Sequence, residues 1–279
     1  MPETQTDFHI RKTLLHGENV IVPANHPSLE LLRFSLLCLN EKESHSFCLD
    51  EEEAALVILT GTASIKIDDS TYERIGGRRD VFSGNAATVY APCHSKIVVD
   101  CAGPGPLSLA VCCSKSTLRR EPALIAPQDV KTKTVGRANW TRHVKDIIDV
   151  SFDAGHIVVG ETINPPGNWS SSPPHRHEVD NPPDEVKMEE IYFFQLKPQQ
   201  GFGFQRIYTD DRSLDVSYAV EHNSTVVLPK GYHPVAAAPG YQLYYLWFMA
   251  GPTSRTLCPK DDPAHSWLKA AEPIIDGLK

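Results

Sequence analysis

The sequence predicts an all-β fold, built from short antiparallel strands that pack as sandwiches or small barrels. Its 22 prolines and 17 glycines are spread through 279 residues, not clustered. Turn signals of this kind recur about every 8–12 residues between apolar or alternating runs, as in β-sandwiches and small barrels. Hydrophobic content of 41% and charged content of 22% fit a globular chain with a substantial core. The length leaves room for one large or two ordinary domains.

Strand candidates follow one another closely in the first half. Residues 31–39 are dense in core residues and lack a helix cap, so we expect a strand. Residues 63–68 alternate apolar and polar side chains, the period of a half-buried strand. Thr60 and Gly61 predict a turn between this run and the preceding one. The expected strands are 19–23, 31–39, 51–59, 63–68, 87–92, 95–100 and 107–113.

The middle of the chain differs from both sides. Residues 115–145 are polar and marked by prolines, the composition of a connector laid over a surface. Its basic and aromatic residues, among them Trp140, could line a site or cover an interface. Residues 155–163 then resume the strand rhythm, and a short helix is expected from Lys269. The similar rhythm of the halves suggests a duplicated architecture, divided into 1–125, 126–145 as connector, and 146–279.

Composition excludes several classes of function. A net charge of -8 argues against a nucleic-acid surface, which needs a basic patch. No apolar run approaches the roughly 20 residues of a membrane span. Residues 1–8 contain no apolar region typical of a secretory signal. Seven cysteines without Cys-x-x-Cys spacing indicate reduced thiols, so we expect a cytoplasmic protein.

Histidines in the second half have the spacing of metal ligands. His175 and His177 are two apart, so on a strand both imidazoles project from one face. Imidazole suits zinc, iron, copper and nickel. Glu190 begins the next strand candidate and could place a carboxylate beside the pair, with Glu189 as its rival. His233 follows a proline–glycine turn. Such a set leaves open positions on an octahedral ion for substrate or water. The first half has no His-x-His pair, so we expect no metal there.

These residues carry a resemblance to a known family. His175-x-His177, Glu190 and Pro229-x-Gly231-x-His233 resemble the two-part metal signature of the cupin superfamily. The loop before Glu190 is longer, and the second motif one residue shorter, than is usual there. Further runs are similar to the 5-deoxy-glucuronate isomerase family of inositol catabolism: Asn139-Trp140, GFGFQRIYTDDRSLD at 201–215, PKGYHPVAAAPGY at 229–241, and Asp261-Asp-Pro-x-His-x-Trp267.

The resemblance is dense from Gly136 to Leu268 and weak in the first half. Residues 221–224 and Trp247-Phe248 are less typical of the family. The resemblance implies a bicupin fold of two tandem barrels, the second of which binds a divalent metal: zinc, manganese, iron or nickel. It also implies the ligands His175, His177, Glu190 and His233. The implied activity converts 5-deoxy-D-glucuronate to 2-deoxy-5-keto-D-gluconate through an enediolate. A small uronic acid would be the substrate, and a homo-oligomer is a further expectation.

An aldose–ketose isomerase needs a base that removes the C2 proton and returns it one carbon over. The candidates are Asp210, Glu189, Tyr232 and a metal-bound hydroxide. We favour Asp210, because it lies in the most family-like run. Tyr208 and Tyr232 could relay protons between oxygens, although core packing explains both tyrosines equally well.

A guanidinium holds the substrate carboxylate best, because its fork matches two oxygens. Arg212 is the first choice and Arg206 the second, and Arg137 or Arg142 could reach in from the connector. Strand alternation would place Arg206, Tyr208, Asp210 and Arg212 on one face if the strand is regular. A structural ion pair is the competing explanation for any one of these arginines.

Three other functions fit the same pattern. A related isomerase of 5-keto-4-deoxyuronate would share the ligands and differ only by substrate assay. An iron-dependent oxygenase would consume oxygen when ferrous iron is added. A non-catalytic sugar-binding cupin would have no need for the polar run from Tyr208 to Arg212.

Overall fold

The computed structural model describes residues 8–278, which are mostly β-structure. The expectation about a secretory signal concerns residues 1–8, and residues 1–7 lie outside this described part. One α-helix, α1 (Trp267–Gly277), lies near the end of the described chain, where a short helix was expected. In its coarse form the prediction of a β-protein is therefore confirmed. None of the helices in residues 8–278 has the length and apolar character needed to cross a membrane.

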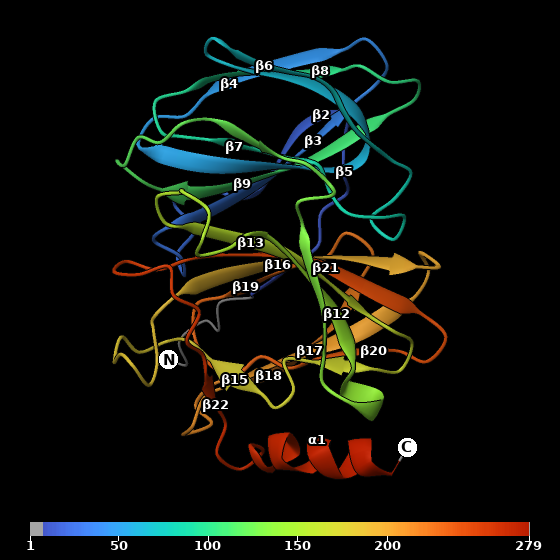
Figure 1. The fold of residues 1–279 in the computed structure, drawn as a ribbon, viewed down its shortest axis with the longest axis vertical. Helices are drawn as coiled ribbons and strands as arrows, with labels where there is room; N and C mark the ends of the chain where they lie inside the picture. The colour runs from blue at the N-terminus through green and yellow to red at the C-terminus, as the bar shows by residue number, and fades with distance from the viewer. Residues whose placement is uncertain (1–7, 279) are drawn as a thin grey trace, which may run out of the picture.

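The first half forms one nine-stranded sheet that curves over itself. Its central path runs β10-β7-β5-β9-β3-β2, and β4, β6 and β8 form a further layer attached through β5. Figure 1 shows this further layer above the central path. The strands are β2 (Gly17–Val22), β3 (Leu32–Leu39), β4 (Ser44–Cys48), β5 (Glu52–Ile67), β6 (Ser70–Arg78), β7 (Thr88–Ala91), β8 (Lys96–Cys101), β9 (Leu107–Lys115) and β10 (Ala123–Ile125).

The second half faces it with a seven-stranded sheet in the order β1-β19-β16-β21-β13-β12-β11. A four-stranded sheet, β14-β20-β17-β18, and the pair β15-β22 lie below it (Figure 1). The elements are β1 (His9–Ile10), β11 (Lys131–Val135), η1 (Ala138–Trp140), β12 (Arg142–Ile148), β13 (Ile157–Asn164), β14 (Trp169–Ser170), β15 (His175–Arg176), β16 (Glu189–Lys197), β17 (Phe202–Tyr208), β18 (Asp215–Glu221), β19 (Thr225–Leu228), β20 (Val235–Ala237), β21 (Gln242–Ala250) and β22 (Lys260–Asp261).

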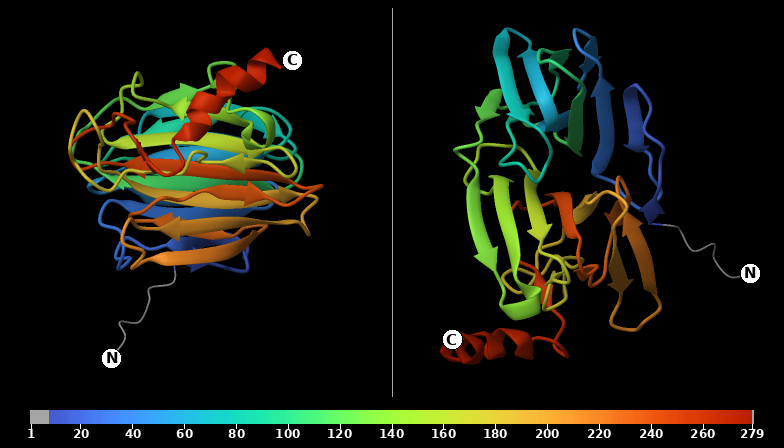
Figure 2. Two further views of the ribbon diagram at one scale, coloured as in Figure 1. Left: turned by 90° about the horizontal axis from the view of Figure 1, so that it is seen from below. Right: turned by 90° about the vertical axis from the view of Figure 1, so that its right-hand side faces the viewer.

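The two large sheets pack on each other through an apolar core. Phe34 of β3 meets Phe193 and Phe248 of the second half at ring-centroid distances of 5.5 and 5.6 Å. Tilted aromatic pairs at this separation are favourable beyond the area they bury. A second apolar cluster lies entirely within the first half, among β5, β8 and β9. The halves are stacked along the longest axis of the molecule, as Figure 1 and the right-hand view of Figure 2 show.

The turn predicted at Thr60 and Gly61 is wrong, because β5 runs through both residues. The pairing is irregular on both sides of these residues: Gly77 of β6 is the extra residue opposite Gly61 and Thr62, and Leu59 of β5 is the extra residue opposite β9. Gly61 has a φ of +89°, and a Cβ there would lie 2.6 Å from the carbonyl oxygen of Pro106. Only glycine fits this position without strain. A turn and a glycine inside an irregular strand share this sequence signal, and the strand pairing distinguishes the two.

Part of residues 126–145 belongs to the seven-stranded sheet. β11 and β12 pair with each other, and β12 also pairs with β13, so this segment adds two strands to the seven-stranded sheet. The first described strand also belongs to the second half, because β1 pairs with β19. The segment predicted as a surface connector therefore contributes β11 and the start of β12 to the edge of the seven-stranded sheet.

Candidate metal centre

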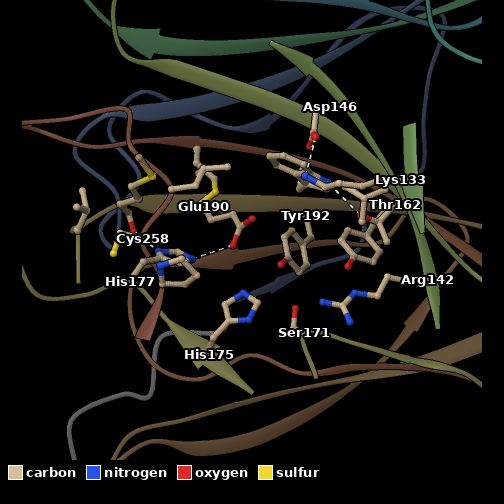
Figure 3. A pocket seen from close by; sticks show the side chains of 18 residues that line it. Lys133, Arg142, Asp146, Thr162, Ser171, His175, His177, Glu190, Tyr192 and Cys258 are labelled. Atoms are coloured by element: carbon tan, nitrogen blue, oxygen red, sulfur yellow. Dashed lines mark hydrogen bonds and ion pairs between the residues drawn. The ribbon is translucent and has the colours of Figure 1, made fainter. Parts of the chain in front are cut away.

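Three segments of the second half bring imidazoles and a carboxylate together. His175 begins β15, His177 follows that strand, Glu190 lies on β16, and His233 follows the loop after β19. One ligand-type atom each from His177, Glu190 and His233 lies within 4.8 Å of the others. The ring of His175 lies 5.0 Å from the ring of His233, measured between centroids. Figure 3 shows His175, His177 and Glu190 lining one cavity.

Backbone carbonyls fix how two of the rings point. Nδ1 of His177 lies 2.7 Å from the carbonyl oxygen of Met188, and Nδ1 of His233 lies 2.9 Å from that of Gly231. Each Nδ1–H therefore donates to a carbonyl, which leaves Nε2 as an acceptor directed into the site. The two Nε2 atoms lie 3.0 and 3.4 Å from Oε2 of Glu190. This is the outer hydrogen-bonding arrangement typical of metal-binding histidines.

The site strongly favours neutral imidazoles at two positions. Burial lowers the pKa of His175 to about 3, and the nearby His177 and Arg142 add to the effect. Burial likewise lowers the pKa of His233 to about 3, against the charge of Glu190. Burial also lowers the pKa of His177, but the hydrogen bond and the charge of Glu190 outweigh this effect, so its pKa is raised overall. Neutral imidazole is the form that binds a metal ion.

The donor set fits a divalent metal ion. Nε2 of His233 is completely buried and has no hydrogen-bond partner. A buried polar atom without a partner is costly, and a cation among the imidazoles would satisfy it. Nitrogen donors with one carboxylate suit zinc and the neighbouring transition metals. His177, Glu190 and His233 would hold the ion, and His175, the fourth ligand that the resemblance implies, has its ring beside that of His233.

The rivalry between Glu189 and Glu190 is resolved by their opposite directions along β16. Glu189 points toward the first half, where its carboxylate accepts hydrogen bonds from the backbone N–H groups of Glu30, Leu31 and Leu32 at 2.7, 2.9 and 3.3 Å. Adjacent residues of a strand face opposite sides of the sheet. Glu189 therefore has a structural role, and Glu190 is the carboxylate at the imidazoles.

A pocket of about 180 Å³ adjoins the imidazoles between the layers of the second half. Figure 3 shows Tyr192 in its centre, with Ser171 between His175 and Arg142. Met188 and Trp247 provide apolar lining, and the indole Nε1–H of Trp247 donates to Oγ1 of Thr162 at 3.1 Å. Lys133 and Asp146 also line the pocket and form an ion pair at 2.7 Å.

Arg142 is the predicted substrate-binding arginine that does line this pocket. Its Nη1 donates to the carbonyl oxygens of Ser172 at 3.2 Å and Trp140 at 3.5 Å. Within residues 8–278 no carboxylate lies within ion-pair distance of it. Burial lowers the pKa of Arg142, although nearby Tyr245 and Glu272 act in the opposite direction. A half-buried guanidinium without an acidic partner is well suited to bind an anionic ligand.

The other predicted side chains gather outside the pocket lining. Asp210 is paired with Arg176 and accepts the hydroxyl hydrogen of Tyr232 at 3.0 Å. The hydroxyl of Tyr208 donates to Asp262 at 2.7 Å. The side chain of Asp210 is 63% exposed. The structure therefore does not bring Asp210, Tyr208 and Tyr232 to the pocket, and their catalytic roles stay predictions.

Arg206 and Arg212 also lie outside the pocket lining. Both guanidinium groups lie over the ring of Tyr208, at 4.4 and 4.1 Å from its centroid, and Arg206 forms two hydrogen bonds with Asp215. The expected alternation through Arg212 is wrong, because β17 ends at Tyr208 and Arg212 has a φ of +58°. Arg137, a further candidate, is paired with Asp276 at 2.7 Å.

The pocket contains hydroxyl groups that sequence reasoning missed. They belong to Tyr192, Tyr245, Thr162 and Ser171. Tyr192 lies two residues after Glu190, so alternation along β16 could have placed it on the same face. Thr162 and Tyr245 meet across β13 and β21, and a register of that kind is not visible in residue spacing.

Comparison with known proteins shows a family match over nearly the whole chain. The model of the KduI/IolB family matches residues 9–268. A protein of Geobacillus thermodenitrificans named 5-deoxy-glucuronate isomerase is 39% identical over 253 residues, which are 90% of this chain and 91% of that protein. A protein of Geobacillus kaustophilus with the same name is 41% identical over 253 residues, with coverage of 90% and 91%.

Solved structures agree with this similarity. An IolB-like protein from Salmonella typhimurium superposes with a TM-score of 0.90 at 36% identity, covering 95% of this chain and all of that one. An oxalate decarboxylase from Lactobacillus farciminis has a TM-score of 0.65 at 12% identity, with 99% and 94% covered. The second similarity concerns the fold alone and supports a cupin-like arrangement.

Proposed function

Because this chain belongs to the KduI/IolB family, we propose that it is an isomerase of 5-deoxy-D-glucuronate, with 2-deoxy-5-keto-D-gluconate as product. The reaction has its place in inositol catabolism, as the resemblance implies. The observation that carries the proposal is the pocket itself. His175, His177 and Glu190 line one side of it beside His233, and Arg142 lines it without an acidic partner among residues 8–278. A uronic acid needs these two features, one for its carbonyl end and one for its carboxylate.

The proposal includes a bicupin architecture and a bound divalent cation. Each half offers a large sheet toward the other and a smaller layer on its outer side (Figure 1). Within the described chain, the cluster of metal-type side chains lies in the second half. Zinc, manganese, iron and nickel all accept the nitrogen and oxygen donors present. A bound cation would supply Lewis-acid stabilisation of the negative charge that develops on the sugar oxygens.

The spacing of strands within the seven-stranded sheet sets the distance between the two proposed contact points of the substrate. Glu190 lies on β16 and Arg142 on β12, with β21 and β13 between these strands. Three strand spacings amount to roughly 14 Å between backbones. Side chains reach inward from both strands, which leaves the length of an extended six-carbon acid between them. The carboxylate of the substrate would therefore bind Arg142 while C1 and C2 lie at the imidazoles.

Hydroxyl groups of the chain lie between these ends. Tyr192 and Ser171 line the middle of the pocket, and both are at least nine-tenths buried. We assign them to donate hydrogen bonds to the sugar oxygens between which a proton moves during isomerisation. The apolar lining from Met188 and Trp247 limits access of water to the reacting carbons. These roles orient the substrate and protect it from competing reactions.

The experiment is a conversion assay with the purified protein and 5-deoxy-D-glucuronate, followed by NMR of substrate and product. We expect the ketose product to accumulate until equilibrium. The 5-keto-4-deoxyuronate is assayed in parallel, and oxygen uptake is followed with added ferrous iron. Conversion of the 4-deoxy acid alone would replace the substrate assignment. Oxygen uptake without conversion of either acid would contradict an isomerase.

A further inference from the structure

The C-terminal tail, residues 260–278, runs along the outside of the second half without joining its core. It comprises β22 and α1, and no side chain of α1 is buried. Figure 1 shows α1 below the small sheets, between the region of β22 and that of η1, and Figure 2 shows it outside the stacked layers. A helix that buries no side chain adds little to folding stability. Its contacts with the site therefore indicate another role.

One end of the tail holds the strand that carries His175. β22 pairs with β15, so that Asp261 is opposite His175. The backbone N–H of Asp262 donates to the carbonyl oxygen of Pro174 at 2.8 Å. The side chain of Asp262 accepts the hydroxyl hydrogen of Tyr208. Lys269 of α1 is paired with Asp261, which ties the helix to this strand pair.

The other end holds the segment on which Arg142 rests. The indole Nε1–H of Trp140 in η1 donates to Glu272 of α1 at 3.2 Å. Arg137, next to η1, binds both carboxylate oxygens of Asp276 at 2.7 and 2.9 Å. The carbonyl oxygen of Trp140 is in turn an acceptor for Arg142.

Gly136 allows the close approach of these groups. It has a φ of +79°, and a Cβ there would collide with the carbonyl oxygen of Trp140 and lie 3.0 Å from Nη1 of Arg142. The guanidinium is therefore in close contact with the backbone around η1. Any displacement of η1 would move Arg142 as well.

We propose that the tail is a brace that sets the distance between the metal-type histidines and Arg142, and that Glu272 is its positioning residue. The inference rests on the proposed function, since it concerns the span of the bound uronic acid. Exposed ion pairs such as those of α1 contribute little to stability. The affinity for the substrate carboxylate, in contrast, depends on where the guanidinium of Arg142 lies, because a bidentate charge-assisted contact requires a defined geometry. The contacts of α1 thus fix the position of Arg142 relative to the histidines.

The test is a double-mutant cycle between Glu272 and Trp140. Glu272→Ala removes the acceptor, Trp140→Phe removes the donor and keeps an aromatic ring, and Glu272→Gln keeps an acceptor without charge. For the first two we expect KM for 5-deoxy-D-glucuronate to rise about three- to tenfold, with kcat within about twofold. The double variant should lie within about twofold of either single one, because one contact is lost. Glu272→Gln should restore most of the affinity.

A readout without turnover accompanies the kinetics. The substrate whose aldehyde has been reduced to an alcohol keeps the carboxylate and cannot isomerise. Its dissociation constant, measured by calorimetry, should rise in parallel with KM, while metal content and Tm stay as in the wild type. Glu221→Ala serves as the matched control, because this surface carboxylate of β18 pairs with Arg11, far in sequence from η1.

The outcomes separate the two claims. KM and dissociation constants within twofold of wild type in every variant would overturn the brace while the isomerase stands. Additive effects of the two single substitutions would overturn it as well. A metal-loaded wild type that neither converts the acid nor binds its reduced analogue would refute the proposed function, and the brace with it.

Discussion

Glu53 and Glu189 each accept hydrogen bonds from the backbone N–H groups of three consecutive residues of the other half. Glu53 receives those of Gly155, His156 and Ile157, where β13 begins. Glu189 receives those of residues 30–32, where β3 begins. Both carboxylates lie at the start of a strand that is paired on both sides, Glu53 on β5 and Glu189 on β16. The two contacts join the halves reciprocally.

Replacing Glu189 should destabilise the protein without emptying the metal site. Glu189→Gln exchanges one acceptor oxygen for an NH₂ group that faces backbone donors. We expect the free energy of unfolding to fall by about 2–3 kcal/mol in urea titrations. Glu190→Gln, the adjacent control on the opposite face, should lower metal affinity more than stability. A stability loss below about 0.5 kcal/mol for Glu189→Gln would show that this contact does not hold the halves together.

The carboxylate of the substrate should depend on Arg142 and be indifferent to Arg212. Arg142→Gln removes the charge that faces the pocket, so KM should rise at least about tenfold, the loss of one charge-assisted contact. Arg212→Gln removes a cation that lies over Tyr208 outside the pocket, and KM should stay within about twofold. Steady-state kinetics of both variants decide the matter. The opposite ranking would restore Arg212 as the binding residue.

Cys112 and Cys113 should resist alkylation in the folded protein. Burial raises the pKa of both thiols, to about 12 for Cys113. The folded protein therefore keeps protons that the unfolded chain releases above pH 9, so this contribution to stability is lost as pH rises from about 9 toward 12. Mass spectrometry after iodoacetamide at pH 8 should find the exposed Cys48 modified and this pair unmodified. Rapid labelling of the pair without unfolding would contradict their burial.

The sequence was informative where a signal is local. Apolar or alternating runs located several strands, including β3 and β13, and motif spacing selected the histidines that the fold brings together. The sequence was misleading where strand pairing, and not local composition, determines the structure. Thr60 and Gly61 have the composition of a turn but lie inside β5, because β6 and β9 pair with this strand on either side.

The same limit applies to the site. Asp210 and Arg212 lie in the most family-like run, yet β17 ends before them and the chain turns. Arg142 reaches the pocket only because residues 131–148 form a hairpin on the edge of the seven-stranded sheet. Spacing along the chain does not reveal which edge a hairpin joins. The direction of Glu189 likewise became clear only from the backbone it contacts.

The most direct test of a metal-dependent isomerase at this pocket is a titration of metal-free protein with zinc or manganese during turnover of 5-deoxy-D-glucuronate. Formation of the ketose should rise linearly with added metal and level off at one ion per chain, and His233→Ala should remain inactive at the same metal concentration. Full activity of thoroughly metal-free protein, or of the His233→Ala variant, would contradict the assignment of this site.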